Sequence, residues 1–342
     1  MLTRSGWLYF HEKDDYFPKM AETGLKQATR RIGILPLDHF ALMSYAACVE
    51  PLRAANLLSQ KPLYEVINIS PDGLAVGSSG QAFINCQATT EADLNLDYLF
   101  VIAGGDPTKL FDTTIMHWLQ RLARFGVRIG GVSGGPLILA KAGLMDGRRM
   151  TVHWEHAEAL AEVSPSLLIE RSLYVIDRDR VTCAGGLAAM DMMHALISQH
   201  HGAMFARMVS DWFLHTDIRP SAGPQRGGLV ERVGTTNAAI LDAVAAMEHH
   251  IADPLGLPQL ATVSGVSPRQ LNRLFRDHLN TRTMAYYRRL RLEKADNLLR
   301  NSSLSLTEIA LATGFASSSH FSSSYRGLFG RPPSAPRARL AG

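Results

Sequence analysis

A serine flanked by glycines is the residue whose setting most suggests chemistry in this chain. Ser133 lies in the run Gly130-Gly-Val-Ser-Gly-Gly-Pro136, where an apolar strand is expected to end and a helix to begin. The residues from Gly131 to Gly135 satisfy the G-x-S-x-G pattern, which presents the nucleophile of serine hydrolases on a sharp turn. Such enzymes also need an acid and then a histidine after the serine. His153 follows Ser133 by only 20 residues, so that order is not evident.

The helix start after Ser133 also offers groups that could hold a ligand. The N–H groups near Ser133, Gly134 and Gly135 would lie at the positive end of that helix and favour a carboxylate. Trp154 beside Glu155 suits a cationic group, because an aromatic face attracts positive charge. In the alternative interpretation, Trp154 belongs to the core and Glu155 is a surface acid. The expected effector-binding residues are Gly105, Ser133, Gly134, Gly135, His153, Trp154 and Glu155.

A second set of suggestive side chains lies on two expected helices near the C-terminus. Arg, Gln and Asn can each present paired hydrogen-bonding groups to a base edge, and a helix fits the major groove of DNA. The first helix carries these residue types, whereas the serines of the second favour phosphate contact. A solvated face is the alternative for the outward cluster. The expected DNA-binding residues are Arg269, Gln270, Asn272, Arg273, Arg276, Ser319, His320, Ser322, Ser323 and Arg326.

An internal repeat predicts how these two helices are positioned. Three apolar residues and a glycine recur 49 residues later, with Leu257, Leu260, Ala261 and Gly265 matching Leu306, Ile309, Ala310 and Gly314. Each copy is typical of a helix-turn-helix, because the glycine permits the positive φ of a tight turn. In the first copy, Ser267 is expected to cap the second helix and Pro268 to occupy its first position. A long helix over 283–299, with Arg288, Arg289, Arg291 and Lys294, would hold the two units about one DNA turn apart.

The charge of the chain is divided unevenly along its length. Residues 255–342 carry 13 Lys and Arg against four acids, whereas the residues before them carry 22 against 27. A basic segment joined to an acidic one favours a nucleic-acid contact at one end only.

The preceding residues alternate between expected strands and helices. Strands are expected over 32–37, 64–69, 98–103 and 127–133, with a strand pair near 173–182; helices are expected over 45–58, 114–125, 136–142, 156–163 and 188–213. Such alternation favours a parallel sheet covered on both faces. Residues 219–228 are rich in Pro and Gly without periodicity, which indicates a linker. We expect an extension over 1–29, a sensing domain over 30–218, a linker over 219–234 and a DNA-binding domain over 235–342.

Bulk composition narrows the class of protein. At 342 residues, 46% hydrophobic and 19% charged, the chain suits two packed domains. No apolar run reaches the roughly 18 residues of a membrane helix, and no secretory signal is evident. Three scattered cysteines, Cys48, Cys86 and Cys183, suit reduced thiols in a cytoplasm and show no metal-ligand spacing. We expect no metal, no cofactor and no membrane contact.

The C-terminal segment resembles the AraC/XylS family. The resemblance is carried by four motifs over about eighty residues: 266–275 (VSPRQLNRLF), 287–293 (YRRLRLE), 309–315 (IALATGF), and 319–321 (SHF) with 329–333 (FGRPP). It implies a transcription factor that binds promoter half-sites on double-stranded DNA, usually as an activator that recruits RNA polymerase.

The segment from about 32 to 214 resembles the class I glutamine amidotransferase-like superfamily, in its PfpI-like branch. The resemblance is carried by 49–56 (VEPLRAAN), 102–105 (IAGG), the turn at Ser133, 142–147 (AGLMDG) and 151–154 (TVHW). It implies a flavodoxin-like α/β fold. Enzymes of this superfamily have a cysteine where Ser133 stands and a histidine at the position of His153, and the PfpI-like branch has a glutamate at the position of Ser44. The resemblance therefore implies a degenerate site with no catalytic residue, retained for binding.

The order of the two domains resembles that of GlxA-type regulators. The resemblance implies a dimeric, ligand-responsive regulator, an activator of catabolic genes whose effector is a small nitrogen compound such as glycine betaine, carnitine, a choline derivative or an arginine-like molecule. Two alternatives remain open at this point. One is a DNA-tethered amidase or hydrolase that uses Ser133, and the other is a ligand-independent architectural DNA binder with a pocketless N-terminal domain.

Overall fold

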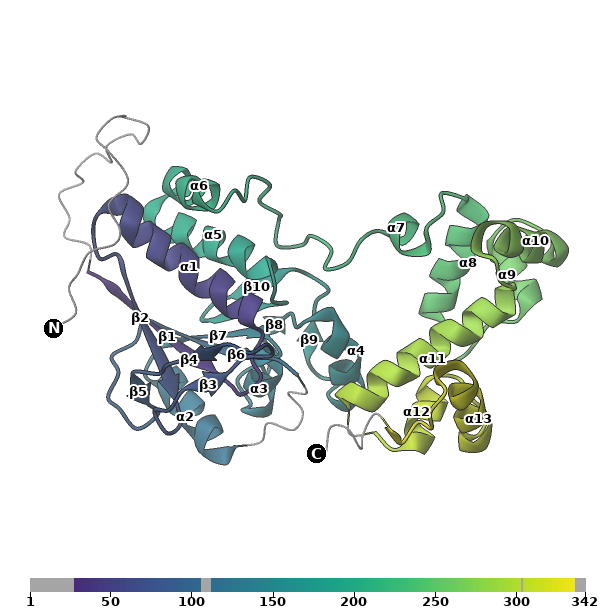
Figure 1. Ribbon diagram of the computed structural model, residues 1–342, viewed down its shortest axis with the longest axis horizontal. Helices are drawn as coiled ribbons and strands as arrows, with labels where there is room; N and C mark the ends of the chain where they lie inside the picture. The colour runs from purple at the N-terminus through teal and green to yellow at the C-terminus, as the bar shows by residue number, and fades with distance from the viewer. Residues whose placement is uncertain (1–27, 106–111, 303, 336–342) are drawn as a thin grey trace.

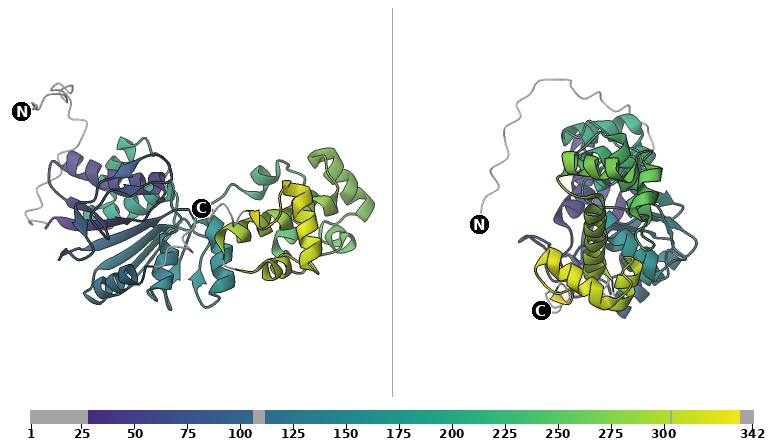
Figure 2. Two further views of the ribbon diagram at one scale, coloured as in Figure 1. Left: turned by 60° about the horizontal axis from the view of Figure 1, so that its bottom comes forward. Right: turned by 90° about the vertical axis from the view of Figure 1, so that its right-hand side faces the viewer.

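The computed structural model describes residues 28–105, 112–302 and 304–335 (Figure 1). Residues 1–27 of the expected N-terminal extension therefore lie outside the described residues. Two bodies are visible, an α/β domain and a smaller helical domain, joined by an extended segment that leads into the short helix α7 (Figures 1 and 2). No helix within the described ranges is both long and apolar enough to cross a membrane.

The α/β domain is built on one seven-stranded sheet in the order β10-β11-β7-β6-β1-β2-β5. All neighbouring strands are parallel except the β10–β11 pair. The central strands are almost fully buried, as expected for a sheet covered on both faces. The strand bounds are β1 Arg30–Pro36, β2 Tyr64–Ser70, β5 Ala88–Thr89, β6 Tyr98–Ala103, β7 Arg128–Ser133, β10 Tyr174–Asp177 and β11 Arg180–Cys183. The predicted mainly parallel sheet is confirmed.

Two layers of helices cover the sheet. The helices α1 (Leu42–Ser59), α5 (Ala188–His201) and α6 (Ala203–Trp212) share one hydrophobic core with it. The helices α2 (Thr113–Arg124), α3 (Gly135–Lys141) and α4 (Trp154–Val163) contribute to the core on the opposite face. The prediction of a single helix over 188–213 is wrong, because Gly202 has a φ of +88° and ends α5.

Like β5 of the main sheet, four further short strands of the α/β domain were not predicted from the sequence. They are β3 (Val76–Gly77), β4 (Phe83–Ile84), β8 (Arg149–Met150) and β9 (Leu168–Ile169). Strands of two residues are too short to show the alternation of apolar and polar side chains that marks a strand. The β8–β9 pair matters for the site, because Thr151, Val152 and His153 follow β8 directly.

The helical domain contains two small cores joined by one long helix. The helices α7 (Leu229–Val233), α8 (Ala238–His249), α9 (Leu257–Val263) and α10 (Pro268–Leu279) surround the first core, and α12 (Leu306–Ala312) and α13 (Ser318–Phe329) surround the second. Helix α11 (Thr283–Asn301) contributes Tyr287 to the first core and Leu292, Ala295, Leu298 and Leu299 to the second. The predicted connecting helix is therefore a shared element of both units.

Candidate effector site and nucleic-acid interface

The turn at Ser133 is held in a strained backbone conformation by close packing. Ser133 is buried and has a φ of +60°, which is rare for a residue other than glycine. A Cβ on Gly135 would lie 2.0 Å from the carbonyl oxygen of Val101, and a Cβ on Gly131 would lie 2.6 Å from the nitrogen of Pro136. The two glycines therefore let the end of β7 and the start of α3 approach the neighbouring backbone, as the sequence pattern predicted.

Ser44 on α1 lies beside this turn, at the position where the PfpI-like resemblance places a glutamate. The N–H of Gly186 donates a 2.8 Å hydrogen bond to Oγ of Ser44. A Cβ on Gly185 would lie 2.7 Å from Cβ of Ser133 and 2.8 Å from Oγ of Ser44, so both serines face the same glycine. The hydroxyl of Ser44 thus secures the loop after β11 next to the turn.

His153 contacts the same turn through its backbone and caps a helix with its side chain. Its N–H donates to the carbonyl oxygen of Ser133 at 3.3 Å. Its Nδ1 accepts the N–H of Glu155 at 3.4 Å, at the start of α4. Burial lowers the pKa of His153, and the carboxylate of Glu155 opposes that shift. With Nδ1 accepting, the neutral imidazole carries its proton on Nε2 and has no second lone pair to take a proton from a serine.

Trp154 and Glu155 lie on the surface beside His153. The side chain of Trp154 is 41% exposed, so the alternative in which Trp154 is a core residue is wrong. The ring centroids of Trp154 and His153 are 5.3 Å apart. The guanidinium of Arg226 lies 4.5 Å from the ring centroid of Trp154. A carboxylate oxygen of Glu155 is 3.9 Å from Nδ1 of His153. An aromatic face, an acid and an imidazole are therefore grouped at the start of α4.

At the start of α3, one of the N–H groups that were expected to hold a carboxylate already has a partner. The N–H of Gly134 donates to the carbonyl oxygen of Ala103 at 3.1 Å, so it is not free for a ligand, contrary to expectation. Gly105, with a φ of +60°, follows β6 two residues after Ala103, which pairs in register with Ser133. The structure thus places Gly105 and Ser133 at the ends of neighbouring strands, with His153 and Trp154 next to the same edge.

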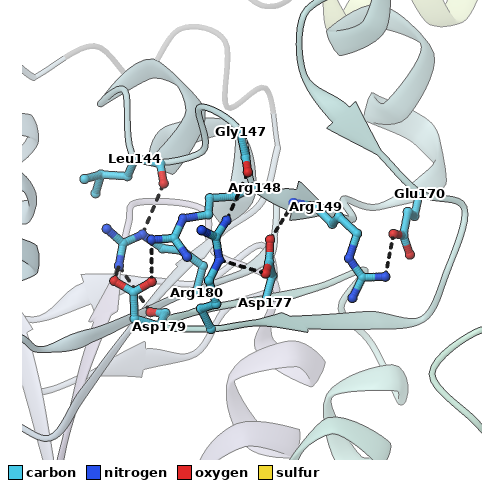
Figure 3. A network of polar contacts seen from close by, with 9 residues as sticks. Leu144, Gly147, Arg148, Arg149, Glu170, Asp177, Asp179 and Arg180 are labelled. Carbon is cyan, nitrogen blue, oxygen red and sulfur yellow. Dashed lines mark hydrogen bonds and ion pairs between the residues drawn. The ribbon is translucent and has the colours of Figure 1, made fainter.

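A network of arginines and acids fixes the strand that leads to His153 (Figure 3). The N–H of Arg149 on β8 donates to Oδ2 of Asp177 at 2.9 Å, and its guanidinium pairs with Glu170 at 3.2 Å. Two residues later, the N–H of Thr151 donates to Oγ1 of Thr182 at 2.9 Å. The segment that leads to His153 is therefore hydrogen-bonded to both β10 and β11.

A cavity of about 550 Å³ lies elsewhere in the α/β domain, at the carboxyl ends of β1 and β2. Its walls include Leu37, Phe83 and Met116, with Asp72 and Asp112 at its polar side. None of the seven expected effector-binding residues lines it. The pocketless N-terminal domain that an architectural DNA binder would have is not what the structure shows.

The first helix-turn-helix presents an arginine face on α10. Ser267 caps the helix and Pro268 is its first residue, as predicted, and Gly265 in the turn has a φ of +67°. Leu271 and Phe275 are fully buried. Arg269, Arg273 and Arg276 are exposed, and no carboxylate among the described residues pairs with them.

Three of the expected base-reading residues of α10 also make local hydrogen bonds. Oε1 of Gln270 accepts the N–H of Ser267 at 3.0 Å and completes the helix cap. Oδ1 of Asn272, which is half-buried, accepts the N–H of Thr283 at 3.2 Å and fastens α10 to α11. Nε of Arg276 donates to the carbonyl oxygen of Asn272 at 3.3 Å, so Arg269 and Arg273 are the exposed arginines of α10 without such a local bond among the described residues.

The second helix-turn-helix repeats the arrangement on α13. Ser317 caps the helix, Gly314 in the turn has a φ of +72°, and Phe321 and Tyr325 are fully buried. Ser319, Ser323 and Arg326 are exposed and Ser322 is half-buried. His320 is exposed, but its ring packs on Phe315 with 5.6 Å between centroids.

Several basic residues of the connecting helix α11 make contacts within the protein. Arg291 donates to the carbonyl oxygens of Thr313 and Gly314, at 2.7 and 2.6 Å, and its guanidinium lies 4.4 Å from the ring centroid of Phe315. Arg289 pairs with Glu293 at 2.7 Å. Burial lowers the pKa of Lys294 to about 8. Arg300 pairs with Asp296 at 2.7 Å, so Arg288 is the exposed basic residue of α11 that pairs with no carboxylate among the described residues.

Comparison with known proteins identifies both domains. Residues 31–199 match the DJ-1/PfpI family, and residues 260–339 match a helix-turn-helix domain. Among solved structures, a ThiJ/PfpI family protein from Pseudomonas syringae superposes with a TM-score of 0.53 at 20% identity, covering 75% of this chain and 99% of that one. An AraC family transcriptional regulator from Pseudomonas putida superposes with a TM-score of 0.50 at 28% identity, covering 54% and 99%.

Relatives align over almost the whole length. The HTH-type transcriptional regulator GlxA of Rhizobium meliloti is 46% identical over 321 residues, which are 94% of this chain and 99% of GlxA. The HTH-type transcriptional regulator CdhR of Pseudomonas aeruginosa is 41% identical, over 90% of this chain and 91% of CdhR. With the two domains in the same order, this chain belongs to the GlxA-type AraC/XylS family of DNA-binding transcriptional regulators with an N-terminal DJ-1/PfpI domain.

Proposed function

We propose that this regulator senses a small molecule in its N-terminal domain and passes the response to its DNA-binding domain. The proposal rests on the position of helix α4, which links the proposed ligand site to the DNA-binding domain. This helix begins at Trp154, capped by His153, and it packs against α11. Figure 1 shows α4 next to the end of α11 that leads into α12. Because α11 contributes to the cores of both helix-turn-helix units, a ligand that moves the start of α4 biases both DNA-reading faces.

We infer that the effector is a small nitrogen compound, the class that the GlxA-type resemblance implies. Glycine betaine, carnitine, choline derivatives and arginine-like molecules all carry a compact cationic group. The exposed ring of Trp154 and the neighbouring Glu155 suit such a group. Ser133 and His153 provide polar atoms beside it. We further propose that the protein works in the cytoplasm as a homodimeric activator that recruits RNA polymerase to catabolic genes.

The test is the DNA affinity of the full chain with and without each compound. A labelled promoter fragment is titrated by fluorescence anisotropy in the presence of arginine, glycine betaine, carnitine or choline. We expect one of them to change the affinity, and we expect Trp154→Leu to abolish the change. Ala75→Trp, which fills the separate cavity from an exposed position, is the matched control. Loss of the response in Ala75→Trp but not in Trp154→Leu would move the effector site to that cavity.

A hydrolase that uses Ser133 is the second candidate, because the strained backbone of a nucleophile turn is present. Catalysis requires the hydroxyl to lie within hydrogen-bond reach of a base. Among the described residues, no hydrogen bond joins the Ser133 hydroxyl to an imidazole, and Nδ1 of His153 is occupied by the cap of α4. We therefore expect no labelling of Ser133 by a fluorophosphonate probe, whereas stoichiometric labelling would support the hydrolase.

A further inference from the structure

Residues 219–226, which follow the α/β domain, are fastened to it, and Arg226 lies over the ring of Trp154. We call residues 219–226 the strap. At its start, the guanidinium of Arg219 binds the buried carboxylate of Asp191 at 2.6 Å. In its middle, the carbonyl oxygen of Ser221 accepts the N–H of Leu173 at 2.8 Å. From its composition, this stretch was predicted only to be a linker.

The end of the strap lies on the residues that precede Trp154. Nε2 of Gln225 donates to Oγ1 of Thr151 at 3.0 Å and to the carbonyl oxygens of Val152 at 3.1 Å and Ser172 at 2.7 Å. The next residue, Arg226, places its guanidinium over the ring of Trp154. The strap and the proposed effector site therefore share the segment 151–154.

The ring face of Trp154 thus already holds a cation supplied by the chain itself. Arg226 is exposed and pairs with no carboxylate among the described residues, so the ring is the contact that positions its guanidinium. Cation–π contacts at exposed sites are weak and exchangeable. A free cation that is also held by the carboxylate of Glu155 would compete with Arg226 for the same face.

We propose that the face of Trp154 is a binding site for a compact organic cation, a guanidinium or an alkylammonium group, and that Arg226 is the resident occupant that this ligand displaces. The proposal rests on the effector response proposed above and names the means of its regulation. Displacement of Arg226 frees the end of the strap next to Gln225. The strap continues through Gly227 and Gly228 into α7, which packs against α8 of the DNA-binding domain, so release of the strap changes how that domain is held.

The first measurement needs no ligand. Hydrogen exchange of the peptide that covers 219–229 is followed in the full-length protein, in Arg226→Gln and in Trp154→Leu. Both substitutions remove the stacked pair, so each is expected to speed exchange of this peptide, and the double variant is expected to exchange no faster than either single one. Arg207→Gln on α6, which breaks an exposed ion pair with Asp211, is the control and is expected to leave the peptide unchanged. Unaltered exchange in both single variants would overturn the role of Arg226.

The second measurement uses arginine, glycine betaine, carnitine and choline as probes in calorimetric titrations of the same proteins. In the wild type, the ligand must first break the exposed cation–π contact between Arg226 and Trp154. Arg226→Gln lacks that contact, so it is expected to bind the preferred cation about 2- to 5-fold more tightly than the wild type. Trp154→Leu is expected to lose binding. Equal affinity in the wild type and Arg226→Gln would overturn the displacement.

The failure of this inference is distinguishable from failure of the proposed function. Cation binding that survives Trp154→Leu would overturn the Trp154 site, although an effector response of DNA affinity would still stand. If none of the four cations binds even to Arg226→Gln, the cation site is excluded. DNA affinity that no ligand changes would instead exclude the proposed sensing function.

Discussion

The guanidinium of Arg219 donates two hydrogen bonds to Oδ2 of Asp191, through Nε at 2.9 Å and Nη2 at 2.6 Å. Asp191 is fully buried on α5, and its Oδ1 accepts from the backbone of Arg219 and contacts Nε2 of His215. This carboxylate therefore ties the end of the α/β domain to the first residue of the strap.

Arg219→Ala removes both guanidinium hydrogen bonds and leaves a buried carboxylate with fewer partners. Because hydrogen bonds to charged groups are stronger than neutral ones, we expect a loss of about 2–3 kcal/mol in the free energy of unfolding. Urea denaturation followed by tryptophan fluorescence measures it. The control is Arg207→Ala, whose exposed pair with Asp211 is expected to contribute about 0.3–0.5 kcal/mol. Equal losses in the two variants would show that Asp191 does not depend on Arg219.

Arg273 and Arg288 are expected to act differently on DNA. Arg273 is exposed on the reading face of α10, so Arg273→Ala is expected to relax the preference at one base pair by about 1–3 kcal/mol. Arg288 is exposed on α11, and Arg288→Ala is expected to weaken binding to all sequences and reduce the salt slope by about 1. Anisotropy titrations against specific and random duplexes at several salt concentrations separate the two effects. Equal losses on both duplexes for Arg273→Ala would mean that α10 does not read bases.

Arg291 is expected to stabilise the second helix-turn-helix rather than to bind DNA directly. Arg291→Ala removes its hydrogen bonds to Thr313 and Gly314 and its stacking on Phe315. Since the carbonyl groups of buried Thr313 and half-buried Gly314 lose their partner, we expect a loss of about 2–3 kcal/mol in stability. Circular dichroism during denaturation measures it, with Arg288→Ala as the matched variant that should leave stability within about 0.5 kcal/mol of the wild type. A wild-type denaturation curve for Arg291→Ala would contradict this role.

The sequence was sufficient to predict the elements that follow a long periodic pattern. β6 was expected at the residues where it is found, and the duplicated turns at Gly265 and Gly314 have the positive φ that the repeat required. The break at Gly202 was missed, because the apolar spacing continues from α5 into α6 and a single glycine is tolerated within helices.

Contacts between distant segments could not be predicted from the sequence. Arg226 stands in a stretch without periodicity, and nothing in its neighbours indicates that it lies over Trp154, 72 positions earlier. The hydrogen bonds of Arg291 to Thr313 and Gly314 were not predicted, because the spacing of residues on a helix does not show which carbonyl groups of the next unit lie beside it. Long-range pairs of this kind depend on the packing of whole elements.

His200 makes the α/β domain sensitive to acid. Its Nδ1 and Nε2 contact the hydroxyls of Tyr64 and Tyr98, at 2.9 and 3.1 Å. Burial lowers the pKa of His200 to about 4, from 6.5 in an unfolded chain. The unfolded state therefore binds more protons between these values, so stability falls as the pH drops from about 6.5 towards 4.

The variant His200→Gln tests this pH dependence. Glutamine does not titrate and can hydrogen-bond both tyrosine hydroxyls. We expect the melting temperature of the variant to fall less than that of the wild type between pH 7 and pH 5, as measured by differential scanning fluorimetry. Parallel curves for the two proteins would assign the acid sensitivity to other groups.

Hydroxyl-radical footprinting of the full chain on its preferred duplex, selected from a random pool, tests most directly whether both helix-turn-helix units bind DNA. For each bound chain, we expect two protected segments centred about 10 base pairs apart, of which Arg273→Ala weakens one and Arg326→Ala the other. Uniform protection without sequence preference, unchanged by either substitution, would contradict the assignment of α10 and α13 as the DNA-reading helices.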